Sequence, residues 1–258
     1  MRIALGIEYF GASYCGWQSQ PTGVAVQCLL ERAINKVAAE KVKVICSGRT
    51  DKGVHAKQQV AHFDTNAYRP VSSWLLGINS NLPDDIKVVW LKPITDAFHA
   101  RFSAVARVYH YYIYNRSISS AIYAKHAYWC YKKLDIIALN KAASYLVGEH
   151  DFSSFRSRGC HANSTIKVIS EFYFVRRGSF IVAVIRGNSF LYNMVRNMMG
   201  SLLEVGCGNY DPSWILSVLH AKDRSKAKNK IAAHGLYFMA AEYRVDLLSL
   251  EKDIEYVF

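Results

Sequence analysis

GRTDKGVHA, residues 48–56, is a polar turn bounded by glycines that lies between two apolar segments. Within it, the carboxylate of Asp51 follows Arg49 by two positions, and a nearby positive charge favours the ionised form of an acid. An ionised Asp held rigidly at the end of a sheet suits a nucleophile that forms a covalent intermediate. The alternative is an ordinary polar turn in which Asp51 bonds its own backbone, a common arrangement for motifs this short.

The apolar pattern around this turn predicts an α+β fold. In the first half of the chain we expect strands at residues 2–10, 42–47, 58–64 and 86–92, and helices at 26–37 and 71–80. In the second half we expect strands at 105–115, 167–175 and 180–186, and helices at 134–147, 191–205 and 211–220. Gly178-Ser179 is a reverse-turn dipeptide that joins two of these strands into a hairpin.

Each half therefore reads strand, helix, strand, strand, helix. This order fits two ferredoxin-like α/β subdomains whose mostly antiparallel sheets join into one extended sheet, with a cleft between the halves. The expected division is residues 1–104 and residues 105–258.

Charge and composition point to a nucleic-acid partner. The 258 residues include 32 Lys and Arg against 20 acidic residues, a net charge of +12, and 13% are aromatic. Such an excess of cations is typical of proteins that bind a polyanion. The basic residues include Lys222, Arg224, Lys226, Lys228 and Lys230, which alternate through a segment that reads as a flexible loop, and Arg156, Arg158, Arg176 and Arg177. An ordinary solvated face is the alternative for any one of them.

Several protein classes are excluded by what the sequence lacks. It has no signal peptide, no apolar run of membrane-spanning length, no Walker or GxGxxG glycine pattern and no GxSxG motif. The six cysteines are scattered without a CxxC pair, which predicts reduced thiols in a cytoplasmic protein. Cys160 and His161 are the candidates for a zinc site, but isolated Cys and His are far more often structural, so no metal is expected.

Two further segments carry candidate binding residues. In the strand Arg107-Val108-Tyr109-His110-Tyr111, alternate side chains share a face, so Arg107, Tyr109 and Tyr111 should lie together. A tyrosine such as Tyr109 can stack on a base, although tyrosine is also a common strand residue. In the helix expected after residue 190, Arg196 lies close to the apolar face, and a partly buried cation needs an acidic partner. Asp51 is the natural candidate, and the alternative is an Arg that extends to solvent.

Blocks in both halves of the chain resemble the tRNA pseudouridine synthase A family. The resemblance rests on GWQSQ (16–20), GRTDKGVHA, FHARFSA (98–104), RVYHY (107–111), GEHDFSSF (148–155), FLYNMVRN (190–197) and HGLY (234–237). Two positions depart from the pattern. Phe10 replaces an acidic residue before Gly11, and residues 229–233 replace a Thr-Ala-Pro run.

This resemblance implies an isomerase that converts uridine to pseudouridine at positions 38, 39 and 40 of the tRNA anticodon stem-loop, without a cofactor. It implies that Asp51 is the nucleophile and that Arg196 pairs with it. Tyr109 is expected to pack on the flipped base, Arg49 to help extrude it and Leu191 to line the uracil pocket. The family acts as a homodimer. Attack at the sugar C1′ or at C6 of the base both remain open, as do a non-catalytic RNA-binding protein and a base-cleaving glycosidase.

Overall fold

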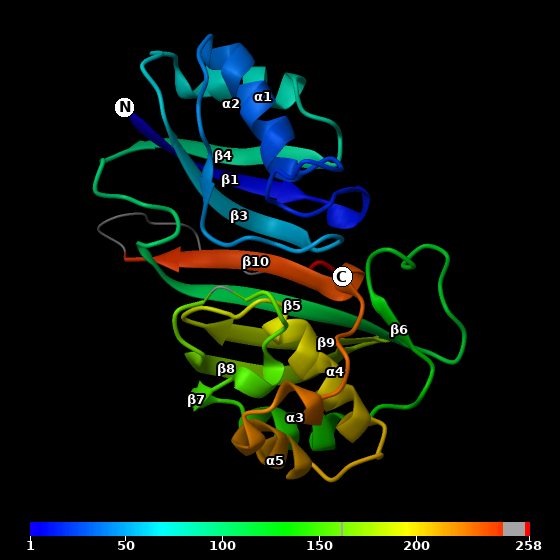
Figure 1. The fold of residues 1–258 in the computed structure, drawn as a ribbon. Coiled ribbons are helices and arrows are strands. Elements are labelled where there is room, and N and C mark those ends of the chain that lie inside the picture. The colour runs from blue at the N-terminus through cyan, green and yellow to red at the C-terminus, as the bar shows by residue number, and fades with distance from the viewer. Residues whose placement is uncertain (161, 245–255) are drawn as a thin grey trace. The chain divides into compact units, whose positions relative to one another are not determined.

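The structure is a computed structural model that describes residues 1–160, 162–244 and 256–258. The described chain divides into two compact units, the first formed by Met1–Arg107 together with Tyr237–Phe258 and the second by Val108–Leu236. Figure 1 shows both units, each with helices packed on a sheet. The α+β class predicted from the sequence is therefore confirmed.

The first unit is a sheet with two helices. Its elements are β1 (Arg2–Tyr9), α1 (Val26–Ala38), β2 (Ile45–Cys46), β3 (His55–Asp64), α2 (Val71–Ser80), β4 (Ile86–Ile94) and β10 (Leu236–Tyr243), with the short 3-10 helix η1 (Gly11–Ser13). The strand order is β4-β1-β3-β10, and β2 pairs with β3. β1 is antiparallel to both β3 and β4, whereas β10 runs parallel to β3. α2 packs on β4 and α1, and the rings of Phe63 and Trp74 meet edge to face in the core.

The second unit carries the remaining elements, the first of which is a strand that begins within the first unit, at residues 104–107. These are β5 (Ala104–Asn115), β6 (Tyr128–Cys130), α3 (Ile136–Ser144), β7 (Gly148–Asp151), β8 (Ile166–Arg177), β9 (Phe180–Gly187), α4 (Met194–Gly206) and α5 (Trp214–Ala221), with the 3-10 helices η2 (Ser153–Phe155), η3 (Arg224–Lys226) and η4 (Ala233–Gly235). The strand order is β5-β9-β8-β7, and β6 pairs with β5. α3 packs on β8 and α4. Buried residues lie on every side of α4, because it forms the centre of the helical layer.

Several element ends differ from the expected ones: β2 covers only Ile45–Cys46, β3 begins three residues early at His55, and local signals account for two of the others. α3 ends at Ser144, before the expected residue 147, and β7 begins at Gly148, whose φ of 113° suits glycine. α4 begins at Met194, three residues later than expected, because Asn193 takes the left-handed conformation with φ of 59°. The hairpin of β8 and β9 turns at Gly178-Ser179 as predicted.

Candidate active site

The turn that holds Asp51 lies between β2 and β3 and is closed by its own backbone. The amide of Val54 donates to the carbonyl oxygen of Asp51 at 3.1 Å, and Gly53 supplies the positive φ of 81° that the turn requires. Asp51 also forms an isolated antiparallel bridge with Gly16. Its side chain is half-buried, whereas Arg49 is exposed.

The GWQSQ segment braces this turn against helix α1. The amide of Trp17 donates to the carbonyl oxygen of Thr50 at 3.0 Å. The carbonyl oxygens of Gly16 and Trp17 accept the amides of Val26 and Gln27, the first two residues of α1, at 3.2 and 3.0 Å. Gly16 has a φ of 110°, and a Cβ there would lie 2.7 Å from the carbonyl oxygen of Thr50. A glycine is therefore required where the segment crosses the turn.

Side chains of β1 and β3 fix two residues that precede the nucleophile candidate. The hydroxyl groups of Tyr9 and Thr50 are hydrogen-bonded at 2.8 Å in a buried contact. Burial raises the pKa of Tyr9 far above its usual value, so its hydroxyl stays protonated. The side-chain amide of Gln59 donates to the carbonyl oxygen of Gly48 at 2.7 Å. Two residues just before Asp51 are thus held by hydrogen bonds from the side chains of β1 and β3.

Phe10, at which the sequence departs from the family pattern, packs against the end of the same turn. The ring of Phe10 stacks on His55, with centroids 4.5 Å apart and planes at 13°. Nδ1 of His55 accepts the amide of Gly11 at 2.9 Å, and His55 is buried. At Gly11 a Cβ would lie 1.9 Å from the carbonyl oxygen of Val54. The aromatic contact therefore stabilises a close backbone approach where the family pattern has an acid.

Alternate side chains of β5 point to opposite faces, as the strand pattern predicted. Tyr109 meets Phe190 edge to face, with centroids 5.0 Å apart, and the Tyr111 hydroxyl donates to the carbonyl oxygen of Ala232 at 2.7 Å. Nδ1 of His110 and the Tyr112 hydroxyl lie 3.3 Å apart. Arg107, which belongs to the first unit, donates instead to backbone carbonyl oxygens of the same unit, those of Ser47, Arg101 and Ala104.

Arg196, in the first turn of α4, is half-buried and oriented by two neighbours in the second unit. Its Nε donates to the carbonyl oxygen of Ile231 at 2.9 Å, and Nη1 donates to Oδ1 of Asn193 at 3.0 Å. The Ile231 amide in turn donates to the Arg196 carbonyl oxygen at 3.3 Å. The segment 229–233, which departs from the family pattern, therefore fixes this guanidinium. Asn193 is 7% exposed, and sequence reasoning did not single it out.

The candidate site residues lie in different units. Arg49 and Asp51 belong to the first unit, and Tyr109, Leu191 and Arg196 belong to the second. Leu191 is buried, and its amide donates to Sδ of Met194 at 3.4 Å. The pairing of Arg196 with Asp51, and the cleft between the halves, stay predictions.

Neither a cluster of metal ligands nor a membrane-spanning helix occurs in residues 1–160, 162–244 and 256–258. There, no three His, Cys, Asp or Glu side chains converge as metal ligands, and no helix is long and apolar enough to cross a bilayer. Cys160 is half-buried, and His161 lies outside the described residues.

Sequence comparisons match nearly the whole chain. A family model described as tRNA pseudouridine synthase matches residues 6–103 and 142–244. A tRNA pseudouridine synthase A of Francisella tularensis subsp. holarctica (strain FTNF002-00 / FTA) is 49% identical over 239 residues, which is 93% of each chain. The protein of the same name from Francisella philomiragia subsp. philomiragia is 48% identical over the same length. The ranges of the family model include Arg49, Asp51, Leu191 and Arg196, and Tyr109 lies between them.

Proposed function

Since the chain belongs to the tRNA pseudouridine synthase family and is an isomerase that converts uridine to pseudouridine in tRNA, we propose that it acts at positions 38, 39 and 40 of the anticodon stem-loop. Asp51 is the nucleophile, and the reacting uridine is flipped out of its stack. The single observation that carries this proposal is the Asp51 turn. It presents one half-buried carboxylate on a backbone fixed by Gly16, Thr50 and Gly53.

The reaction needs only groups that the chain supplies. Asp51 attacks the uridine at C1′ or C6, the bond between C1′ and N1 breaks, and the detached uracil turns in place. C5 then bonds to C1′, and the covalent bond to Asp51 breaks and restores its carboxylate. The proton on C5 leaves, and N1 takes up a proton. Because the product is an isomer of the substrate, no redox partner or co-substrate enters, and the reaction requires no cofactor. The site must exclude water, since water would release the base.

The remaining candidates act around this nucleophile. Arg196 pairs with Asp51 and keeps the carboxylate ionised, because a neighbouring opposite charge favours the charged form. Tyr109 packs on the flipped base, a contact of about 1–3 kcal/mol for base–aromatic stacking. Leu191 lines the uracil pocket. Arg49, which is exposed beside the nucleophile, helps extrude the base or fills its place. Leaving the stack costs the uridine a few kcal/mol, least in a loop.

Chemical mapping of pseudouridine in treated tRNA tests the proposed positions. An unmodified tRNA with uridine at 38, 39 and 40 should gain pseudouridine at those positions and at no others after incubation with the protein. Variants of the same tRNA with cytidine at each of the three positions are the matched controls. Modification confined to another region of the tRNA would refute the positions but keep the reaction. Free uracil and an abasic tRNA would instead indicate a glycosidase.

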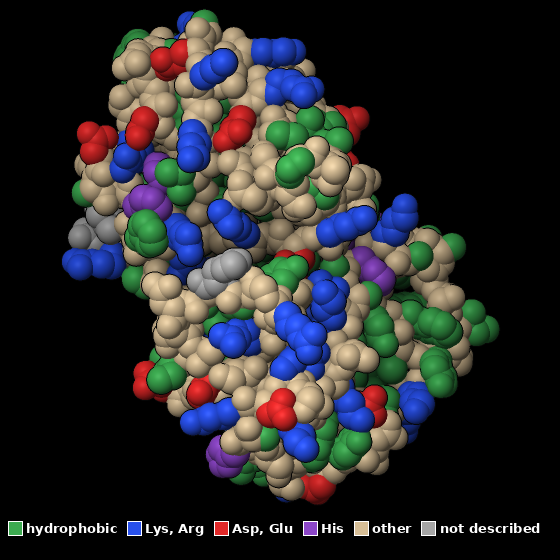
Figure 2. Space-filling model, viewed as in Figure 1, with side chains coloured by type: hydrophobic (Ala, Val, Ile, Leu, Met, Phe, Trp, Pro, Cys, Tyr) green, Lys and Arg blue, Asp and Glu red, His purple; other side chains and the backbone are tan. Residues whose placement is uncertain are grey.

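The exposed apolar surface of the second unit supports a homodimer. Large hydrophobic side chains are exposed along the segment 116–131, at Ile118, Ile122, Trp129 and Tyr131. Figure 2 shows hydrophobic side chains gathered on one flank of this unit. Exposed patches of this kind often mark protein interfaces.

The tRNA substrate and the six free thiols favour a cytoplasmic location. Detection of the protein only outside the cytoplasm would contradict this.

Sedimentation equilibrium tests the homodimer. We expect a mass twice that of the 29.2 kDa chain, and we expect Ile122→Lys to shift the protein toward the monomer, because it places a charge in the apolar patch. Ile137→Lys on α3 is the control, since Ile137 is 79% exposed against 78% for Ile122. A monomeric wild-type protein at micromolar concentration would contradict the proposal.

A further inference from the structure

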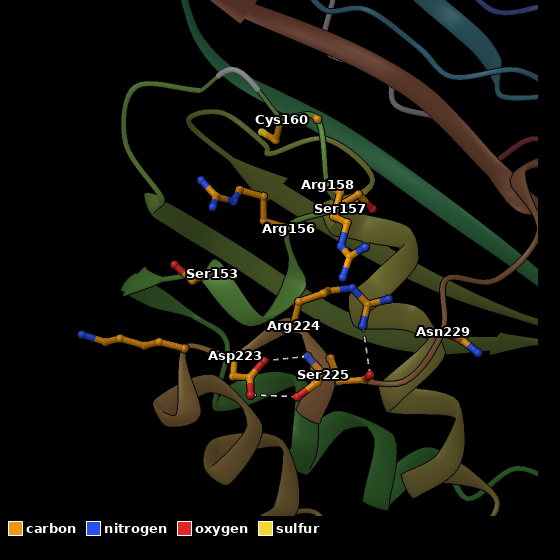
Figure 3. A pocket seen from close by; sticks show the side chains of 12 residues that line it. Ser153, Arg156, Ser157, Arg158, Cys160, Asp223, Arg224, Ser225 and Asn229 are labelled. Atoms are coloured by element: carbon orange, nitrogen blue, oxygen red, sulfur yellow. Dashed lines mark hydrogen bonds between the residues drawn. The ribbon is translucent and has the colours of Figure 1, made fainter.

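A pocket of about 750 Å³ opens in the second unit, and none of the candidate site residues is among those that line it. It lies between the segment that follows η2 and the segment that contains η3 (Figure 3). The residues that line it are Ser153, Arg156, Ser157, Arg158, Gly159, Cys160, Lys222, Asp223, Arg224, Ser225, Ala227 and Asn229. Four of these carry a positive charge, and Asp223 alone carries a negative one.

Arg224 is the fixed cation of this pocket. One Nη donates to Oδ1 of Asn197 at 3.0 Å and the other to the carbonyl oxygen of Ala227 at 2.9 Å. Burial lowers the pKa of its guanidinium from the usual value. No carboxylate of the described residues forms an ion pair with it. A partly desolvated guanidinium held only by neutral oxygens retains an unmet preference for an anion.

The neighbouring acids are already bound to other groups. The carboxylate of Asp223 accepts the amide and the hydroxyl of Ser225 at 2.8 and 2.7 Å, and these hydrogen bonds lower the pKa of Asp223. Asp151 accepts the hydroxyl of Ser153 at 2.6 Å and lies 3.9 Å from the ammonium of Lys222. The arginines of the pocket are thus not neutralised by the acids nearest in the chain.

The two segments that form the walls of the pocket are held together by hydrogen bonds of buried polar side chains. Asn197 is fully buried on α4, and its Nδ2 donates to the carbonyl oxygen of Phe155 at 2.7 Å while its Oδ1 binds Arg224. The hydroxyl of Ser154, also fully buried, donates to the carbonyl oxygen of Val218 at 2.6 Å and accepts the Asp223 amide at 2.9 Å. Both walls are therefore positioned before any ligand arrives.

Two exposed arginines extend this positive surface. In Figure 3 the side chain of Arg158 points toward Arg224, whereas Arg156 points away from both. Within the described chain, neither Arg156 nor Arg158 has a carboxylate partner. Figure 2 shows Lys and Arg side chains gathered on the face of this unit that carries α4. The cations are spread along a wall, an arrangement that suits successive phosphates of a backbone better than one small anion.

We propose that this pocket binds phosphate groups of the tRNA backbone. The inference rests on the proposed function for its ligand. Arginine presents a planar fork of donors that matches phosphate oxygens, and contacts of this kind position a nucleic acid without reading its sequence. The pocket therefore contributes affinity and register, and the chemical step does not depend on it.

The double variant Arg156→Ala/Arg158→Ala tests the pocket. Both side chains are exposed and make no side-chain hydrogen bond or ion pair with the described residues, so stability should be unchanged. We expect the Kd for tRNA to rise about tenfold at physiological salt, and the slope of log K against log salt to fall by about 1 to 2, as two phosphate contacts are lost. Turnover at saturating tRNA should stay at the wild-type value. Lys132→Ala/Lys133→Ala, two exposed cations outside the pocket, is the charge-matched control.

Further measurements separate the outcomes. Arg224→Gln should raise the Kd as well, with the melting temperature measured because this variant also loses the hydrogen bonds to Asn197 and Ala227. A double variant that matches the lysine control in Kd and in salt slope would overturn the proposal. The proposal would also be overturned if the wild-type protein bound inorganic phosphate and the double variant did not, while both had the same affinity for tRNA. Failure of the proposed function is distinct, since wild-type protein would then bind tRNA without forming pseudouridine at 38, 39 or 40.

Discussion

Asp51→Ala should abolish the release of tritium from tRNA labelled at C5 of uracil, with a loss of turnover of at least about 10⁴-fold, as is found when a nucleophile is removed. The tRNA affinity should remain near the wild-type value, because one carboxylate contributes nothing favourable to phosphate contacts. The melting temperature should also change little. The turn is closed by the Val54 amide and braced by the Trp17 amide, and both bonds end on backbone oxygens that survive the substitution.

Asp84→Ala is the matched control for this experiment. Asp84 is a fully exposed aspartate of the same unit, and its ion pair with Lys87 spans only three residues. It should keep wild-type turnover, since exposed pairs of this kind are worth little. Turnover of Asp51→Ala within tenfold of the wild type would remove the nucleophile assignment. A large fall in melting temperature would support the ordinary polar turn, in which the Asp51 side chain holds its own loop.

The sequence was sufficient for features that local rules determine. The turn that contains Asp51 lies between two strands, β2 and β3, because apolar runs flank a glycine-bounded polar segment. The faces of β5 follow from the alternation of side chains along a strand. Tyr109 contacts Phe190, and Tyr111 bonds the carbonyl oxygen of Ala232. Gly178 marks the hairpin of β8 and β9 because its positive φ suits the turn.

Features made by residues distant in the chain were not predictable in the same way. β10 pairs in parallel with β3, so that Tyr237 lies beside His55 across more than 180 positions of sequence. The expected division placed residues 236–243 with the second half, whereas β10 joins the sheet of the first unit. An eight-residue apolar run does not indicate which strand it will pair with. Its backbone N–H and C=O groups can form hydrogen bonds with any strand edge of suitable register.

The orientation of the candidate site residues was also not predictable from the sequence. The sequence indicated that Arg196 lies near an apolar face, but its partners in the second unit are a carbonyl oxygen of Ile231 and an Asn193 in the left-handed conformation. Carbonyl acceptors are present at every residue, so no sequence pattern distinguishes this one. Gly16 is the converse case. The sequence identified it as part of the GWQSQ block. The structure shows why a glycine is needed there, because the chain passes close to the carbonyl oxygen of Thr50.

Arg196→Gln should lower turnover by about 10²–10³-fold while tRNA affinity stays near normal. A loss of this size corresponds to about 3–4 kcal/mol less stabilisation of the transition state. The amide of Gln can still donate toward Ile231, so the start of α4 should keep its structure and the melting temperature should fall only modestly. What is lost is the positive charge that favours the ionised carboxylate of Asp51.

Two comparisons isolate this charge effect. Arg196→Lys retains the charge but not the planar fork, so its turnover should lie between those of the wild type and Arg196→Gln. The acidic limb of the pH profile of turnover should move to higher pH in Arg196→Gln, because without the cation Asp51 binds its proton more tightly. In Arg196→Lys the limb should move less. If instead tRNA affinity falls while turnover at saturation and the acidic limb stay unchanged, Arg196 binds the RNA backbone and does not pair with Asp51.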